Sequence, residues 1–287
     1  MTKCLLLFSG GLDSILAKEI LERQEIKVET INFGSCFFNG KKSIVKEHLK
    51  IVKNPRLGRG KEMNPCRDCH LLMLKTAAEI MKKKKYDFIA TGEVVSQRPF
   101  SQSKQQLLFF DKEAGIERRV LRPLSAQIMP ETIPEKKGIV DRRKLFGISG
   151  KSRKQQLALA KEFKIEEFPS PAGGCILTDK EYSKKLKKLL EVNPKFDCKD
   201  ARILNYGRVF FKSKTMFVVT RNEQEENNIK RCFKKGDIIL CPINFSGPLV
   251  LIRNFGSLKI DLEKGKSYIL KYSKKIPVKT EIKIVKK

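Results

Sequence analysis

The sequence predicts an α/β fold, in which helices cover both faces of a parallel sheet, followed by a smaller α+β domain. The chain opens with an apolar run, a helical pattern and a second apolar run, and this βαβ order implies parallel strands. A length of 287 residues is long for one domain and indicates two. Farther along the chain, short apolar runs alternate with turn residues, which is typical of an α+β domain. We therefore expect domains at 1–180 and 181–287.

Apolar spacing predicts the individual elements of the first domain. Residues 4–8 form an apolar run, and apolar residues at helical spacing then predict a helix over 13–24. On the same grounds we expect a strand at 28–33, a short helix within 41–52, a helix opened by Asn64 and Pro65, a strand at 87–91, a hairpin of 107–111 with 118–124, a helix capped by Ser152, and a strand at 175–178.

The second domain is predicted from shorter runs separated by turns. Asp179 is a good cap for a helix over about residues 180–191. We expect strands at 209–211, 216–220, 238–240, 249–253 and 268–271, with one helix at 223–233.

The turn after the first strand reads Ser9-Gly10-Gly11-Leu12-Asp13-Ser14. Two glycines let backbone N–H groups approach an anion, and the following helix adds its positive dipole end. Ser9 and Ser14 supply hydroxyl donors, and Asp13 is expected to cap the helix and to help hold Mg²⁺. A strand followed by this motif resembles the PP-loop of ATP pyrophosphatases, which split ATP into AMP and pyrophosphate. The resemblance implies that residues 9–14 bind ATP.

The ends of the other strands should meet this turn, because the carboxyl ends of parallel strands lie at one edge of a sheet and ligands bind there. Phe33 and Gly34 end the second predicted strand, and we expect them to lie against the adenine. A Walker A motif is excluded at Gly150-Lys151-Ser152, because position 145 is leucine where that motif needs glycine.

Three cysteines stand in places where thiolates are useful. Cys66 and Cys69 form a C-x-x-C motif in the first turn of a predicted helix, where the helix dipole and Arg67 favour the thiolate. Cys175 follows a Gly-rich loop at 171–174. Three thiolates suit three irons of a [4Fe–4S] cluster whose fourth iron stays open. A zinc site with His70, a redox pair of Cys69 with Cys175, and a purely structural role are the alternatives.

The composition points to a polyanionic partner. Lys and Arg number 61 against 32 Asp and Glu, a formal net charge of +29, and nucleic acid is the natural partner of such a field. A Lys-rich thermophilic surface is less favoured, because that habit adds Glu as well. No apolar run reaches the length of a membrane span, and no secretory signal is visible, so we expect a cytoplasmic protein. Eight cysteines in such a protein indicate metal or redox chemistry.

Together these motifs resemble the PP-loop tRNA thiouridine synthases. The matching pieces are residues 9–14, the helix start at 64–69, Ala90-Thr91-Gly92 after a strand, and Gly173-Gly174-Cys175. The likeness is closest to the 2-thiouridine synthases, many of which carry an Asp where Cys66 stands here. The extra thiol makes the chain more similar to the three-cysteine, iron–sulfur-dependent thiolases.

This resemblance implies an activity and a site. ATP would adenylate a uridine carbonyl oxygen of tRNA, and sulfur from sulfide or a cysteine-desulfurase relay would replace it. Asp13, Cys69 and Cys175 would be catalytic, Phe33 and Gly92 would border the nucleotide, and Cys66, Cys69 and Cys175 would hold the metal. The alternatives are nitrogen transfer of the amidotransferase or lysidine type, and a non-catalytic basic RNA-binding protein.

The end of the chain carries a second resemblance. Gly207-Arg208, Thr220-Arg221-Asn222-Glu223 with Glu226-Asn227, and Phe245-Ser246-Gly247-Pro248 are similar to the small RNA-associated NFACT-R domain. The resemblance implies that the basic second domain contacts RNA.

Overall fold

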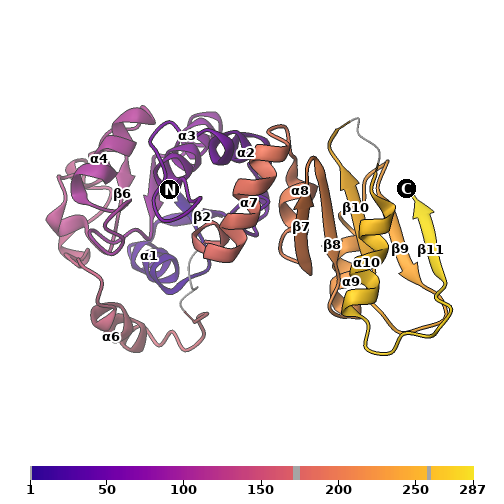
Figure 1. The fold of residues 1–287 in the computed structure, drawn as a ribbon. Coiled ribbons are helices and arrows are strands. Elements are labelled where there is room, and N and C mark those ends of the chain that lie inside the picture. The colour runs from indigo at the N-terminus through magenta and orange to yellow at the C-terminus, as the bar shows by residue number, and fades with distance from the viewer. Residues whose placement is uncertain (1, 171–174, 257–259) are drawn as a thin grey trace. The chain divides into compact units, whose positions relative to one another are not determined.

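The computed structural model describes residues 2–170, 175–256 and 260–287 (Figure 1). The chain forms two compact units, Met1–Cys175 and Ile176–Lys287. The division falls close to residue 180, where the sequence placed the domain boundary. Within the described residues, no helix is both long and apolar enough to cross a membrane.

The first unit is built on a four-stranded parallel sheet in the order β2-β1-β5-β6. The strands are β1 (Lys3–Leu7), β2 (Lys27–Ile31), β5 (Phe88–Thr91) and β6 (Val120–Leu121). Cys4, Leu5 and Leu6 are all buried, because helices cover both faces of the central strand. The predicted α/β class with parallel strands is therefore confirmed.

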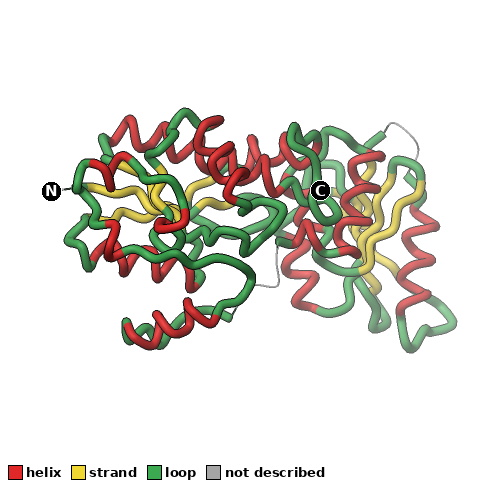
Figure 2. The backbone as a smooth tube through the Cα atoms, turned by 90° about the vertical axis from the view of Figure 1, so that its left-hand side faces the viewer, coloured by secondary structure: helices red, strands yellow, loops and turns green. Residues whose placement is uncertain are grey.

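Two helical layers enclose this sheet (Figure 2). On one face, α1 (Leu12–Glu22) and α6 (Lys154–Glu162) share a core with the strands. On the other face, the core is formed by α3 (Cys66–Lys84) and α4 (Lys104–Glu113), with α2 (Val45–Lys53) packed on α3. The shorter elements are η1 (Ala126–Ile128), α5 (Ile133–Lys136) and η2 (Arg142–Lys144).

The second predicted strand ends early. It stops at Ile31, and the chain then forms a separate two-stranded parallel ribbon of β3 (Phe33–Gly34) with β4 (Lys42–Ser43). Asn32 makes the break, since its side-chain Nδ2 donates to the carbonyl of Phe8 over 2.9 Å. A side chain at Gly34 would come within 2.4 Å of the carbonyl oxygen of Gly40, so the two turns of this ribbon meet backbone to backbone.

The predicted hairpin of 107–111 with 118–124 is wrong. The first half is the helix α4, whose N-cap Ser103 accepts a hydrogen bond from the backbone N–H of Gln106. Its buried residues Leu107, Phe110 and Asp111 have helical spacing, which the run of apolar residues in this segment obscured. The second half supplies β6, which pairs parallel to β5.

The second unit contains a five-stranded antiparallel sheet in the order β11-β9-β10-β8-β7. Its strands are β7 (Arg208–Lys212), β8 (Thr215–Val219), β9 (Ile238–Pro242), β10 (Val250–Asn254) and β11 (Ile282–Lys286). Its helices are η3 (Ile176–Thr178), α7 (Lys180–Val192), α8 (Cys198–Ile203), α9 (Glu223–Lys230) and α10 (Leu262–Tyr272).

Two predicted strands of this region are helical, and one strand was missed. Residues 176–178 form the short helix η3, and residues 268–271 lie in α10, which buries Gly265 and Ile269 against the sheet. A side chain at Gly265 would stand 2.6 Å from Leu240, so this glycine allows the close packing. The missed strand is β11, whose alternating Ile and Lys residues are mostly exposed at the sheet edge.

His48 gives the first unit a pH-dependent stability. The imidazole is buried on α2 between the edges of Phe37 and Phe38, and burial lowers its pKa to about 4. Above pH 6.5 the ring is neutral in both states, whereas between pH 6.5 and 4 the unfolded chain binds a proton that the folded chain excludes. Stability should therefore fall by about 3 kcal/mol over this window.

Denaturant unfolding of the full chain at pH 7, 5.5 and 4.5 measures this loss. His48→Leu should unfold with a free energy that depends less on pH over the same range, because no buried imidazole then resists protonation. Equal pH dependence of the two proteins would contradict the assignment.

Candidate active site

The turn at 9–14 leads from β1 into α1 and is fixed by its own hydroxyl groups. Gly10 has a φ of +80°, a conformation that glycine adopts at no cost. The Ser9 hydroxyl accepts from the N–H of Gly11 over 3.3 Å, and the Ser14 hydroxyl donates to the carbonyl of Gly11 over 2.8 Å. The result is a rigid glycine turn directly before a helix N-terminus, which is the arrangement that binds phosphate.

Asp13 does not cap the helix, contrary to the sequence prediction. Gly11 is the N-cap, in extended conformation and without a side-chain bond, and Asp13 is the second residue of α1. Its Oδ2 accepts from Gln97 Nε2 over 3.2 Å, while its Oδ1 is buried with no hydrogen-bond partner. A buried carboxylate oxygen without a donor is a position that a cation can fill. The site therefore fits ATP with Mg²⁺.

Leu12 and Phe33 contribute less than their side chains suggest. Leu12 is buried in the core under the sheet, so only its backbone N–H is available to an anion. Phe33 is 6% exposed and packs with Leu5 and Leu71 in the opposite core. Most of its ring is thus used for packing within the first unit.

Gly92 lies behind the glycine turn, just after the end of β5. A Cβ at this position would stand 2.6 Å from the backbone nitrogen of Ser14 and 2.7 Å from the carbonyl of Asp13. The end of β5 and the start of α1 thus meet backbone to backbone, which fixes where the turn sits over the sheet edge.

Gly92→Ala should therefore push the first turn of α1 out of place. We expect a loss of about 1–3 kcal/mol of stability from overpacking, together with a larger proportional loss of ATP affinity. Calorimetric titration with Mg·ATP and denaturant unfolding measure the two effects. Gly147→Ala is the matched control, since Gly147 also lacks a positive φ and a Cβ there would meet only side-chain atoms at 3.4 Å or more. Unchanged ATP binding by Gly92→Ala would contradict this account.

The three predicted cysteines come together. Cys66 and Cys69 are the first and fourth residues of α3, whose N-cap is Pro65 and not Asn64. Burial raises the pKa of the Cys69 thiol above its usual range, and the charges of Cys66 and Cys175 raise it further. The sulfurs of Cys66 and Cys175 are therefore both within electrostatic reach of Cys69. The Gly-rich loop at 171–174 lies outside the described residues.

The donor set is three thiols, which suits a soft metal or an iron–sulfur cluster. Over the described part of the chain, no group of three or more His, Cys, Asp or Glu side chains is spaced to hold a metal ion. His70, the candidate fourth zinc ligand, hydrogen-bonds to Cys66 and through Nδ1 to Glu93 Oε1 over 2.8 Å. Its ring is therefore already engaged on both sides.

Cys66 is connected through hydrogen bonds and ion pairs to a buried series of alternating charges that the sequence did not predict. Glu93 joins His70 to Arg122, whose Nε donates to Glu93 Oε2 over 3.1 Å. Arg122 is 2% exposed and makes two further bonds of 2.8 Å to the carboxylate of Asp111. We call Cys66, His70, Glu93, Arg122 and Asp111 the charge relay.

The relay sets the protonation of its members. Burial alone lowers the pKa of His70, but the bonds to Cys66 and Glu93 raise it to about 10. Burial alone raises the pKa of Glu93, but the charge of Arg122 and the bond from His70 lower it to about 2. For Cys66 as well, burial is the largest influence and acts upward, yet His70 holds the pKa of the thiol below its usual value. The relay thus favours a Cys66 thiolate beside a protonated His70.

A weak sequence signal for the relay existed. Glu93 follows directly on the strand-end Gly92, and Arg122 stands inside the apolar run 120–124. A charged residue in a buried run needs a partner of opposite charge. The partner of Arg122 was hidden because Asp111 was assigned to a hairpin.

One loop links the glycine turn to the cysteines. Residues 96–102 are closed by a 2.7 Å bond from the N–H of Ser96 to the carbonyl of Gln102. From this loop Gln97 reaches Asp13, while the charge of Arg98 acts on Cys66. The segment 96–102 therefore contacts both the glycine turn at 9–14 and the start of α3.

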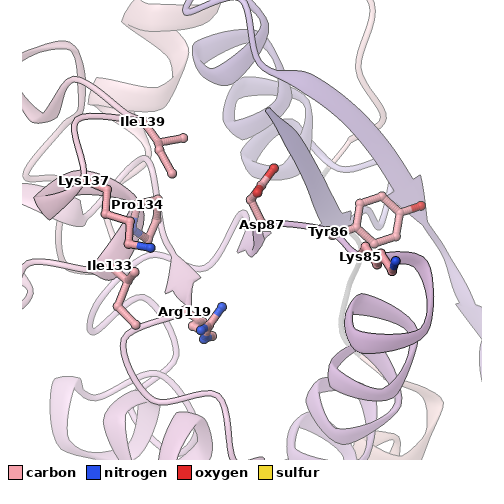
Figure 3. A pocket seen from close by; sticks show the side chains of 8 residues that line it. All are labelled: Lys85, Tyr86, Asp87, Arg119, Ile133, Pro134, Lys137 and Ile139. Atoms are coloured by element: carbon pink, nitrogen blue, oxygen red, sulfur yellow. The ribbon is translucent and has the colours of Figure 1, made fainter. Parts of the chain in front are cut away.

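The pocket drawn in Figure 3, with a volume of about 280 Å³, lies elsewhere. It is lined by Asp87, just before β5, and Arg119, just before β6, with Lys137 and Pro134 opposite them. It is therefore at the amino ends of the strands, whereas ligands of parallel sheets bind at the carboxyl ends. We do not assign the chemistry to it.

Comparisons with known proteins address mainly the second unit. A search of curated proteins gives no match. A crystal structure titled as a predicted subunit of tRNA methyltransferase, from Methanocaldococcus jannaschii, aligns at 16% identity over 70% of this chain and 91% of that chain, with a TM-score of 0.37. A TM-score this low supports no conclusion about function. Residues 207–287 match the family model of the NFACT protein RNA binding domain, which confirms the second resemblance drawn from the sequence.

Proposed function

We propose that this chain is an ATP-dependent thiolase that replaces a uridine carbonyl oxygen of tRNA with sulfur. The observation that carries the proposal is the gathering of Cys66, Cys69 and Cys175 in the same unit as the glycine turn at 9–14. A phosphate cradle by itself serves many reactions, but three thiols within electrostatic reach of one another in the same unit favour sulfur transfer.

The cradle activates the oxygen that must leave. Oxide is a poor leaving group, so the uridine oxygen first attacks the α-phosphorus of ATP, and the bond from that phosphorus to pyrophosphate breaks. The backbone N–H groups of Leu12 and Asp13, in the first turn of α1, would stabilise the departing charge. Asp13, through its unpartnered Oδ1, would hold Mg²⁺ against the same phosphates.

Sulfur delivered at the cysteines then attacks the activated carbon, the carbon–oxygen bond breaks, and AMP leaves with the oxygen. The three thiols are not spaced for a metal ion as they stand in the described residues, and we propose that Cys66, Cys69 and Cys175 move together to hold three irons of a [4Fe–4S] cluster, which when bound would supply an open iron for hydrosulfide. His70 and Glu93 keep Cys66 in place through the charge relay. In the alternative route without a cluster, a cysteine desulfurase loads Cys175 with a persulfide whose outer sulfur attacks the carbon. Cys69 then displaces the product from Cys175, and an external thiol reduces the resulting disulfide.

The second unit supports an RNA substrate. Its match to an RNA-binding domain family agrees with the net charge of +29, which favours contacts to phosphate. We propose tRNA as the RNA, delivered to the cytoplasmic enzyme with sulfide or a cysteine desulfurase as the sulfur source.

The test is pyrophosphate release by the full chain with Mg·ATP and unmodified tRNA, followed by mass spectrometry of the nucleosides. Thiolation predicts release that depends on tRNA and a nucleoside in which one oxygen is replaced by sulfur. Release without any sulfur-containing nucleoside would favour nitrogen transfer, in which the cysteines have no role. Absence of release would leave only RNA binding and overturn the proposal.

A further inference from the structure

We infer that the turn Gly150–Gln156 is a second phosphate site, which binds the polyphosphate of the nucleotide together with the glycine turn at 9–14. The inference rests on the proposed function in one respect, namely that the nucleotide is ATP. It concerns a segment to which the Walker A pattern gives no role.

The position of this turn follows from three hydrogen bonds. Val95, beyond the end of β5, forms a parallel bridge with Ser149, and the N–H of Gly150 donates to the carbonyl of Val95 over 2.8 Å. Ser125 links the two bridged segments, because its hydroxyl accepts from the N–H of Val95 over 3.0 Å and donates to the carbonyl of Ile148 over 2.7 Å. The turn therefore begins at the carboxyl edge of the sheet, where the glycine turn also lies.

The helix after the turn runs in the same direction as α1. Leu159 and Ala160 of α6 share a core with Leu16 and Ala17 of α1. At the far ends of the two helices, the guanidinium of Arg23 stacks on Phe163 with a separation of 4.2 Å. Since their C-terminal ends meet, the N-termini of α1 and α6 lie at the same end of this packed pair, and each carries unpaired N–H groups.

The turn itself has the features of an anion cradle. Gly150 has a φ of +87°, and a Cβ there would meet nothing within 4 Å, so the backbone is open on that side. The N-cap Arg153 makes no side-chain capping bond to the helix. Lys151, Arg153 and Lys154 surround the turn, and no acidic residue occurs between Asp141 and Glu162.

A buried amide provides the second, independent observation. Gln156 is 0% exposed, in the first turn of α6 and on the face that packs toward α1, yet neither its Oε1 nor its Nε2 has a hydrogen-bond partner. Arg153 Nε is buried and unpartnered as well. Buried polar groups without partners are costly, and they are retained where a ligand supplies the missing bonds. These donors and the positive field select phosphate oxygens.

The test is the affinity of the full chain for Mg·ATP. Gln156→Met keeps the size of the side chain and removes the unpartnered amide, and Lys151→Met removes a charge from the turn. Each should weaken Mg·ATP binding about tenfold, as loss of one charge-assisted or buried hydrogen bond does. Gln156→Met should leave thermal stability equal or higher, because a buried unpartnered group is lost.

Matched controls lie on the same helix. Gln155→Met and Lys161→Met change exposed side chains of α6 and should bind Mg·ATP as the unaltered protein does. If the unaltered protein binds Mg·ATP and both Gln156→Met and Lys151→Met bind it equally well, the second phosphate site is excluded while the proposed function stands. A loss of tRNA affinity alone would also overturn it, by assigning the turn to RNA phosphates. If the unaltered protein binds no ATP, the proposed function fails first.

Discussion

Cys66→Ala is expected to lose tRNA thiolation by at least about 100-fold, because loss of even an outer-shell partner at a metal site costs up to that much. Cys66 belongs both to the charge relay and to the three cysteines. Its replacement by alanine removes one thiol and the hydrogen bond between Cys66 and His70. The measurement is thiouridine formed per enzyme with Mg·ATP and free sulfide, with iron determined in anaerobically purified protein.

The outcome separates the two sulfur routes. The cluster route predicts loss of iron together with activity in Cys66→Ala, and it fails if activity with free sulfide survives unchanged. In the persulfide route, assayed with a cysteine desulfurase and cysteine in place of free sulfide, Cys175→Ala and Cys69→Ala should be inactive while Cys66→Ala retains activity. Cys241→Ala, which changes a half-buried thiol of β9 in the second unit, is the matched control and should keep full activity.

Arg122→Met is expected to destabilise the first unit by about 3–5 kcal/mol, the cost of breaking a buried ion pair from one side. The guanidinium balances the carboxylates of both Glu93 and Asp111, and methionine would leave Asp111 buried without a cation and Glu93 with His70 as its cationic partner. Denaturant unfolding gives the size of the loss, and hydrogen exchange should locate it in Met1–Cys175.

Arg143→Met provides the comparison. Arg143 also forms an ion pair, with Asp141, but its side chain is 91% exposed, so its loss should cost no more than about 1 kcal/mol. Adding Asp111→Leu to Arg122→Met should recover part of the stability, because the buried carboxylate that Arg122→Met leaves unpaired is then gone. Equal losses for Arg122→Met and Arg143→Met would show that the relay contributes nothing beyond a surface pair.

The features that the sequence predicted correctly are those set by neighbours along the chain. The βαβ order, the glycine turn at 9–14 and the cap at Asp179 each depend on a few consecutive residues. The C-x-x-C motif likewise needed only helical spacing to place Cys66 and Cys69 on one face. Even here the cap of α1 was misassigned, because Gly11 can take the extended N-cap conformation and leaves Asp13 inside the helix.

The misassigned elements have a common cause. Residues 107–111 and 268–271 are short and largely apolar or aromatic, so both helix and strand accommodate them. Packing determines that both segments are helical. Helix α4 buries Leu107 and Phe110 within the first unit, and Gly265 of α10 packs closely onto the second sheet. Local propensity is too weak to outweigh such contacts.

By itself the sequence determined the class of fold, the glycine turn at 9–14 and the positions of the three thiols in the chain. Only the tertiary structure decided that Glu93, Arg122 and Asp111 form one line behind Cys66, and that Gln156 remains buried without a partner beside a second helix N-terminus. The physical reason is that backbone turns and helix faces are short-range properties. Pairing of buried charges instead depends on which distant segments the sheet brings together, and a single sequence does not specify that order.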